Sequence, residues 1–208
     1  SWSASGESAA VSRSSSLPPP PGRRFFHLIA GSGIPLAGLF APQPELAASV
    51  AVLAVISLGL DLVRFRMAGL NRLFLRWLAP LLKHDEDRKI TGASYMLAAA
   101  LIAFLIFDRQ VAVLALLFLA LGDPAAALVG SRMPGPRLLG KSPGGTVAFA
   151  GVSMLVVLAL SLSGRVDYHW GMLVGGLVAA LVELAPLPVD DNLTIPLASG
   201  GAMQLLVG

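Results

Sequence analysis

The residues most suited to chemistry are charged groups that interrupt apolar stretches. The clearest is Asp123, which lies within an apolar run over residues 115–129, between Gly122 and Pro124. A carboxylate at membrane depth is unfavourable by a few kcal/mol and by default marks a functional site. Because glycine and proline weaken helices, we expect a helix break here that frees backbone groups. We interpret Asp123 as part of a metal or phosphate site; the alternative is a hydrated carboxylate near the membrane surface.

A second candidate is the loop 135–142, whose letters fit the P-loop pattern G-x-x-x-x-G-K-[ST]. A P-loop requires a preceding strand of a parallel sheet, whereas a membrane helix is expected here, so we reject that fold. The local chemistry remains, because a helix N-terminus with free amides and a lysine favours anions. The alternative is a basic loop that serves topology alone. The residues expected to bind phosphate are Lys141, Ser142, Gly144, Gly145 and Thr146.

A third candidate is the acidic stretch that follows Pro186 and Pro188. Oxygen ligands without His or Cys suit hard cations, and Mg²⁺ is usually held by one or two carboxylates plus substrate phosphates. The alternative is a solvated turn in which one aspartate caps the last helix, and one aspartate could cap while the other binds metal. The expected metal ligands are Asp123, Glu183, Asp190 and Asp191.

Weaker signals lie nearer the N-terminus. Arg23 and Arg24 precede the first apolar segment and His27 lies near its start; the arginines act on the site or simply extend to the membrane surface. From the end of the second apolar segment to the start of the third, both charge signs mix, and we expect most of these residues to pair with one another or with head groups. They are Asp61, Arg64, Asn71, Lys83, Glu86 and Gly92. No nucleophile and base pair supports a hydrolase.

The elements that must position these residues are membrane helices. Of the 208 residues, 55% are hydrophobic and 13% charged, and there is no cysteine. This composition predicts an all-α polytopic membrane protein with about seven transmembrane helices and one interfacial amphipathic helix within 64–91. The net charge of +3 forms no aromatic-interleaved stripe, so we expect no nucleic-acid partner. The expected apolar segments are 25–41, 45–63, 92–107, 111–130, 145–163, 170–187 and 193–207.

Domain organisation and topology follow from the same pattern. Residues 1–22 are rich in Ser and Pro and are expected to form a disordered tail, followed by a single transmembrane catalytic domain over 23–208. Threading the seven segments with the N-terminus inside leaves only Arg109 and Arg165, of 15 Lys and Arg residues, on the outer side. Cytoplasmic loops carry the excess of basic residues. We therefore expect the N-terminus and the site on the cytoplasmic side.

The motifs, in their order, resemble the family of CTP-dependent lipid kinases that includes dolichol kinase, phytol kinase and yeast-type diacylglycerol kinase, which is similar to phosphatidate cytidylyltransferases. Arg23 to His27 resembles the family's opening motif, and Lys83 to Tyr95 its segment ending in Thr-Gly-x-x-Tyr. Gly122 to Ala126 with 140–146 resembles the core, in which Pro143 and Thr146 depart from the pattern. Glu183 and the run from Asp191 to Pro196 resemble the closing motif.

The resemblance implies transfer of a phosphoryl group from CTP, with Mg²⁺, to a lipid alcohol such as a polyprenol, phytol or diacylglycerol. Asp123, Lys141, Arg23 and Arg24 would be catalytic, with Asp123 a metal ligand or the base for the lipid hydroxyl. Asn192 would contact the nucleotide. The alternatives are a cytidylyltransferase that makes a CDP-lipid, a small transporter, and a passive scaffold. The sequence does not indicate the oligomeric state.

Overall fold

The computed structural model describes residues 21–78, 89–133 and 135–207, with side chains from Leu28 onward except that of Leu78. Of the disordered tail expected over residues 1–22, residues 1–20 lie outside the described residues, as do Lys83 and Glu86, whereas Pro21 and Gly22 belong to the first helix, so the tail ends earlier than expected. Every regular element is a helix in the described ranges, as the composition predicts. The helices are α1 (Pro21–Gly38), α2 (Gln43–Arg66), α3 (Ala68–Leu78), α4 (Gly92–Ile106), α5 (Arg109–Arg132), α6 (Pro143–Leu162), α7 (Trp170–Leu184) and α8 (Asp191–Val207).

Three of these helices, α2, α5 and α6, are long and apolar enough to cross a membrane. The described part of α1 and helices α4 and α7 are apolar but shorter. The prediction of a helical membrane protein is therefore confirmed, while the count of seven spans is not. The short helix α3 lies within the stretch where an amphipathic helix was expected.

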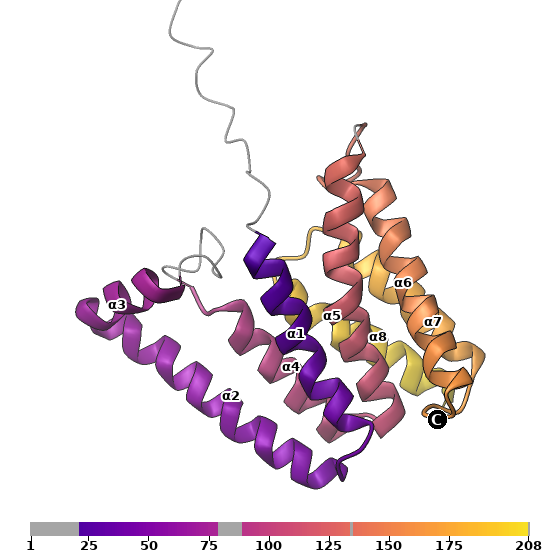
Figure 1. Ribbon diagram of the computed structural model, residues 1–208, viewed down its shortest axis with the longest axis horizontal. Coiled ribbons are helices and arrows are strands. Elements are labelled where there is room, and N and C mark those ends of the chain that lie inside the picture. The colour runs from indigo at the N-terminus through magenta and orange to yellow at the C-terminus, as the bar shows by residue number, and fades with distance from the viewer. Residues whose placement is uncertain (1–20, 79–88, 134, 208) are drawn as a thin grey trace, which may run out of the picture.

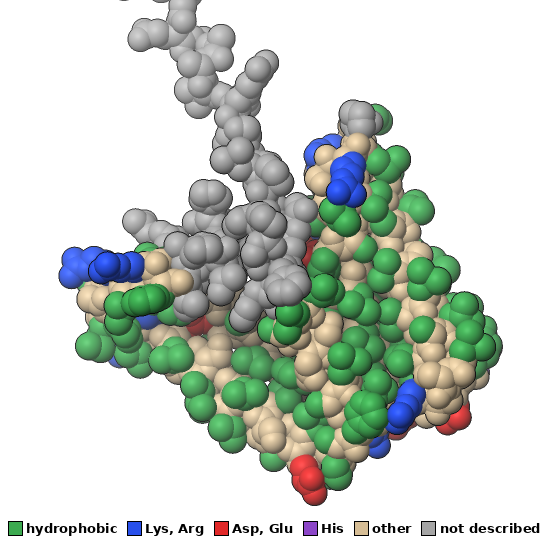
Figure 2. Space-filling model, in the orientation of Figure 1, with side chains coloured by type: hydrophobic (Ala, Val, Ile, Leu, Met, Phe, Trp, Pro, Cys, Tyr) green, Lys and Arg blue, Asp and Glu red, His purple; other side chains and the backbone are tan. Residues whose placement is uncertain are grey.

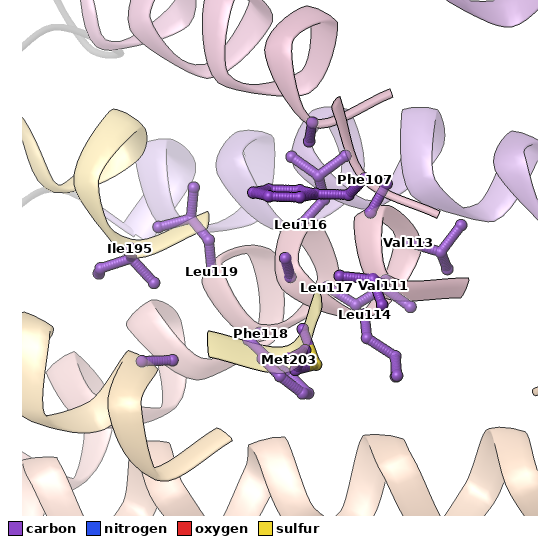
Figure 3. Close-up of a cluster of buried hydrophobic side chains, with 14 of the residues drawn as sticks. Phe107, Val111, Val113, Leu114, Leu116, Leu117, Phe118, Leu119, Ile195 and Met203 are labelled. Carbon is purple, nitrogen blue, oxygen red and sulfur yellow. The ribbon is translucent and has the colours of Figure 1, made fainter. Parts of the chain in front are cut away.

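Helix α5 forms the centre of the bundle and packs against α1, α6, α7 and α8 (Figure 1). Every residue from Val111 to Ala120 is buried, so this helix is apolar on all faces. Phe107, Ile195 and Met203 join it in one cluster (Figure 3). Helix α2 lies at the edge of the bundle, where it packs mainly on α4 and exposes a row of large apolar side chains.

Helix α5 runs without interruption through Pro124, so the expected break at this residue is wrong. Proline removes one backbone hydrogen bond from a helix interior. Close packing of α6 against α5 at Gly122 offsets the loss of this hydrogen bond. A Cβ atom at Gly122 would lie 2.8 Å from the Phe149 ring of α6. The helix around Asp123 is therefore continuous within the packed bundle.

The helix ends gather at two ends of the bundle. At one end, which we call the basic end, α2 and α5 finish in Arg66 and Arg132 and α4, α6 and α8 begin. Hydrogen bonds between sequence-distant residues tie the opposite end together. The Gln43 side chain donates to the Phe104 carbonyl at 2.7 Å, and Gln204 and Asp108 exchange hydrogen bonds at 2.8 Å. Asp123, the loop 135–142 and the acidic stretch after Pro188 all lie toward the basic end.

Candidate functional site

Lys141 is positioned by a two-residue turn between α5 and α6. The backbone N–H of Lys141 donates to the Leu138 carbonyl at 2.9 Å, and the N–H of Leu138 donates back at 2.8 Å. The two central residues, Leu139 and Gly140, both have positive φ, at 52° and 87°. Such a turn favours glycine because a side chain is strained there. The loop whose sequence fits the P-loop pattern thus contains a tight turn that positions Lys141.

The Lys141 ammonium group lies between two carboxylates from other helix ends. It donates to Asp191 Oδ2 at 3.0 Å and lies 3.1 Å from Glu183 Oε1, and it also donates to the Glu183 carbonyl. These three acceptors use all three donors of an ammonium group. Burial by itself lowers the pKa of Lys141, but the negative charges of Asp191 and Glu183 outweigh it, so the pKa lies above its ordinary value. The group therefore remains positively charged.

The N-terminus of α6 lies beside this ion pair and close to α5. A Cβ atom at Gly145 would lie 2.8 Å from the Ala126 carbonyl oxygen, so the two backbones approach as closely as glycine allows. Gly144 and Gly145 contribute backbone N–H groups without partners inside the helix. Ser142 makes no capping hydrogen bond with its side chain. The amide groups expected to bind phosphate therefore stand next to Lys141.

Asp123 lies in α5, half-buried, one helical turn before Ala126. Its carboxylate has no hydrogen-bond or ion-pair partner in the part of the chain that the structure describes. It lies near enough to Glu183 for the two negative charges to repel each other. Glu183 is buried, and its second carboxylate oxygen accepts a hydrogen bond of 3.4 Å from Thr146. Asp123 is thus an acidic group whose charge no described side chain balances.

The two adjacent aspartates have different roles at the start of α8. Asp190 precedes the helix and its carboxylate accepts from the Asn192 N–H at 3.0 Å, while its carbonyl accepts from the Leu193 and Thr194 N–H groups. This is the capping role that the sequence left open for one of the pair. Asp191 instead contacts Lys141. The Asn192 side chain is buried and makes no hydrogen bond to another described side chain or backbone group.

The described residues do not assemble the four expected metal ligands into a preformed metal site. Across the described ranges, no group of three or more His, Cys, Asp or Glu side chains is placed to hold a metal ion. Lys141 occupies the position between Glu183 and Asp191, and Asp190 faces the start of α8. The side chains of Arg23, Arg24 and His27 lie outside the described residues.

Comparison with known proteins supports the resemblance drawn from the motifs. The chain is 27% identical over 162 residues to CTP-dependent diacylglycerol kinase 1 of Schizosaccharomyces pombe, covering 71% of this chain and 74% of that protein. It is 30% identical over 130 residues to probable phytol kinase 3, chloroplastic, of Glycine max, covering 55% of this chain and 41% of that protein.

The resemblance to the CTP-dependent lipid kinases is confirmed. The chain is also 27% identical over 188 residues to the uncharacterized protein RP860 of Rickettsia prowazekii, covering 85% of this chain and 89% of that protein. No family model matches the chain. No solved structure matches it either.

Sequence reasoning missed the direct pairing of Lys141 with Glu183 and Asp191. It assigned Lys141 to phosphate and the two acids to metal within one site, without a contact between them. The sequence did contain a signal for this pairing. Lys141, Glu183 and Asp191 lie at helix ends that the predicted topology places on the same side of the membrane. The pairing joins the residues expected to bind phosphate and those expected to bind metal into one charged cluster.

A second polar cluster, around Asp61 and Arg64, is more deeply buried than the sequence indicated. Asp61 and Arg64 of α2 pair at 2.8 Å with side chains only 2% and 1% exposed. The carboxylate of Asp61 also accepts hydrogen bonds from Thr91 and Ser94 at the start of α4. The expectation that these charged residues pair with one another is confirmed for Asp61, Arg64 and Asn71. Their i,i+3 spacing on a helix was the available signal.

Proposed function

We propose that this chain is an integral-membrane kinase that transfers the terminal phosphoryl group of CTP to a lipid alcohol. The observation that carries the proposal is the Lys141 ammonium held at the N-terminus of α6, beside Glu183, Asp191 and Asp123, whose carboxylate has no partner among the described residues. Phosphoryl transfer requires mainly positioning and charge neutralisation. The names of two relatives, a CTP-dependent diacylglycerol kinase and a probable phytol kinase, supply the donor and the acceptor class.

Lys141 and the first amides of α6 would bind the nucleotide phosphates. Because Glu183 and Asp191 already occupy the three ammonium donors, Lys141 would attract phosphate through its positive charge, and the free N–H groups of the helix N-terminus would supply the directed donors. Gly144 and Gly145 would contribute their backbone N–H groups, while the space that a side chain would need is taken by Met133 and by the Ala126 carbonyl. Asn192, whose buried amide has no described hydrogen-bond partner, supplies a further contact. We keep Arg23 and Arg24, at the start of α1, as additional candidates for phosphate neutralisation.

The charge balance of the cluster fits a divalent cation that arrives with the nucleotide. Asp123, Glu183 and Asp191 carry three negative charges against the single positive charge of Lys141. Mg²⁺ is usually bound by one or two carboxylates and the phosphates of its substrate, so a complete protein site is not needed. Asp123 and Glu183 would hold the ion, which would neutralise charge on the transferred phosphoryl group.

Asp123 could instead accept the proton of the lipid hydroxyl, since its carboxylate has no described partner. The two roles differ in their kinetics. If Asp123 is a metal ligand, Asp123→Glu should raise the Mg²⁺ concentration needed for half-maximal rate, with most of kcat recovered at high Mg²⁺. If it is the base, added Mg²⁺ should leave the loss in kcat unchanged.

The experiment that tests the function is an assay of purified protein with CTP and a panel of diacylglycerol, phytol and a polyprenol. The proposal expects CDP and a lipid monophosphate from at least one alcohol, and no product with Asp123→Asn. The matching lipid phosphates are tested in parallel, and release of pyrophosphate with a CDP-lipid formed from one of them would favour the cytidylyltransferase alternative. No product from any lipid alcohol or lipid phosphate would contradict both enzymatic assignments.

We further propose that the basic end faces the cytoplasm, as the distribution of Lys and Arg requires. The lipid alcohol would then reach the site from the membrane and CTP from the aqueous side. The absence of cysteine from the chain makes this orientation directly testable by labelling single introduced cysteines.

A further inference from the structure

Helix α3 carries exposed arginines that the catalytic proposal does not use. Arg72 and Arg76 are four residues apart, so they share one face of the helix, and both are exposed. The described residues offer no carboxylate that pairs with either of them. Two like charges at this spacing destabilise a helix slightly. Within the described residues, both guanidinium groups are thus available to an anion.

A buried network holds the opposite side of α3 on α2. The Arg64 guanidinium donates to Asn71 Oδ1 at 3.2 Å and lies 4.6 Å from the centre of the Phe74 ring. It also donates to the Lys89 carbonyl and to Asp61 Oδ1. Through these contacts Arg64 links α3 and the segment before α4 to the end of α2. The orientation of α3 is therefore fixed by the protein, and Arg72 and Arg76 are held away from the bundle.

Apolar side chains stand next to these arginines. Leu73 is 52% and Trp77 is 74% exposed, and each follows an arginine by one residue. Helix α2, which precedes α3, also exposes large apolar side chains, among them Leu60 and Phe65. Figure 2 shows the basic side chains of this region beside apolar ones at the edge of the molecule. An acidic protein segment would satisfy the arginines but leave Leu73 and Trp77 in water, whereas the surface of an anionic bilayer satisfies both.

We infer that α3 is a docking element for anionic lipid head groups, with Arg72 and Arg76 as the ligands of the head-group phosphates and Trp77 inserted at the interface. Arginine recognises phosphate through its planar array of donors. Tryptophan prefers the membrane interface, where its ring is buried and its N–H is hydrated. The inference does not depend on the proposed kinase activity.

The test uses the quenching of Trp77 by brominated lipids. Trp2 and Trp170 are replaced with Phe, which leaves Trp77 as the single tryptophan of the chain. This parent protein is reconstituted into phosphatidylcholine vesicles that contain equal small fractions of either brominated phosphatidylglycerol or brominated phosphatidylcholine. Arg72→Gln with Arg76→Gln is the test variant. The matched control is Arg132→Gln with Arg137→Gln, which removes the same charge from two other exposed arginines at the basic end.

In the parent protein, brominated phosphatidylglycerol should quench at least about twofold more strongly than brominated phosphatidylcholine, because each arginine near the surface enriches anionic lipid. The preference should decline at high salt. It should vanish in the test variant and persist in the control, while quenching by brominated phosphatidylcholine stays unchanged and shows that Trp77 still lies at the membrane. Equal quenching by the two lipids in the parent, or a preference that survives in the test variant, would overturn the inference.

Discussion

Replacing Lys141 with Met should lower the free energy of unfolding by about 2–3 kcal/mol. The substitution removes the ammonium group that lies 3.1 Å from Glu183 Oε1 and 3.0 Å from Asp191 Oδ2. Breaking a buried ion pair by removing one partner costs roughly 3–5 kcal/mol, because a buried charge is left uncompensated. We take a smaller value because 31% of the Lys141 side chain is exposed, whereas only 9% of the Glu183 side chain is.

The loss should depend on the charge that remains at Glu183, which also lies near Asp123. Neutralising it in the Lys141→Met background by Glu183→Gln should therefore recover part of the stability, so the double variant loses less than the sum of the two single losses. Unfolding in mixed micelles, followed by circular dichroism, measures all four proteins. A Lys141→Met protein within about 0.5 kcal/mol of the parent, the usual range for an unimportant surface change, would refute this assignment.

Three further predictions concern the fold and the topology. Arg64→Met should cost about 3–5 kcal/mol because it strands the buried Asp61 carboxylate, whereas Arg66→Met, at an exposed position, should stay within about 0.5 kcal/mol in the same unfolding assay. Gly145→Ala should impair both stability and activity because its Cβ would lie 2.8 Å from the Ala126 carbonyl, while Gly151→Ala, with open space around it, should be neutral or slightly stabilising. A cysteine introduced at position 135 should resist an impermeant reagent added outside intact cells, and labelling from outside would contradict the proposed orientation.

Much of the helical architecture could be predicted from hydropathy alone. Each of the seven expected apolar segments corresponds to a helix, and the expected 111–130 and 145–163 match α5 (Arg109–Arg132) and α6 (Pro143–Leu162) within two residues. The ends are predictable because proline, glycine and charged residues bound long apolar runs. The number of membrane spans was harder to predict from the sequence, because α4 and α7 are apolar but short.

The side-chain partners could not be predicted in the same way. Lys141 meets Asp191 across 50 residues of sequence, and only the packing of three helix ends decides that contact. The continuity of α5 through Pro124 has a similar origin, because local propensity favours a break whereas close packing of Gly122 on Phe149 retains the helix. The role of Asp190 was left between capping and metal binding. The structure gives it the hydrogen bonds of a cap.

The measurement that tests the central claim most directly is a double-label transfer from CTP that carries distinguishable phosphorus isotopes at the α and γ positions. One reaction with purified protein, Mg²⁺ and an accepted lipid alcohol then reports which phosphorus is attacked. A lipid product that contains only the γ isotope, with CDP retaining the α isotope, is the result that the kinase assignment predicts. A lipid product that contains the α isotope, with release of pyrophosphate, would contradict it.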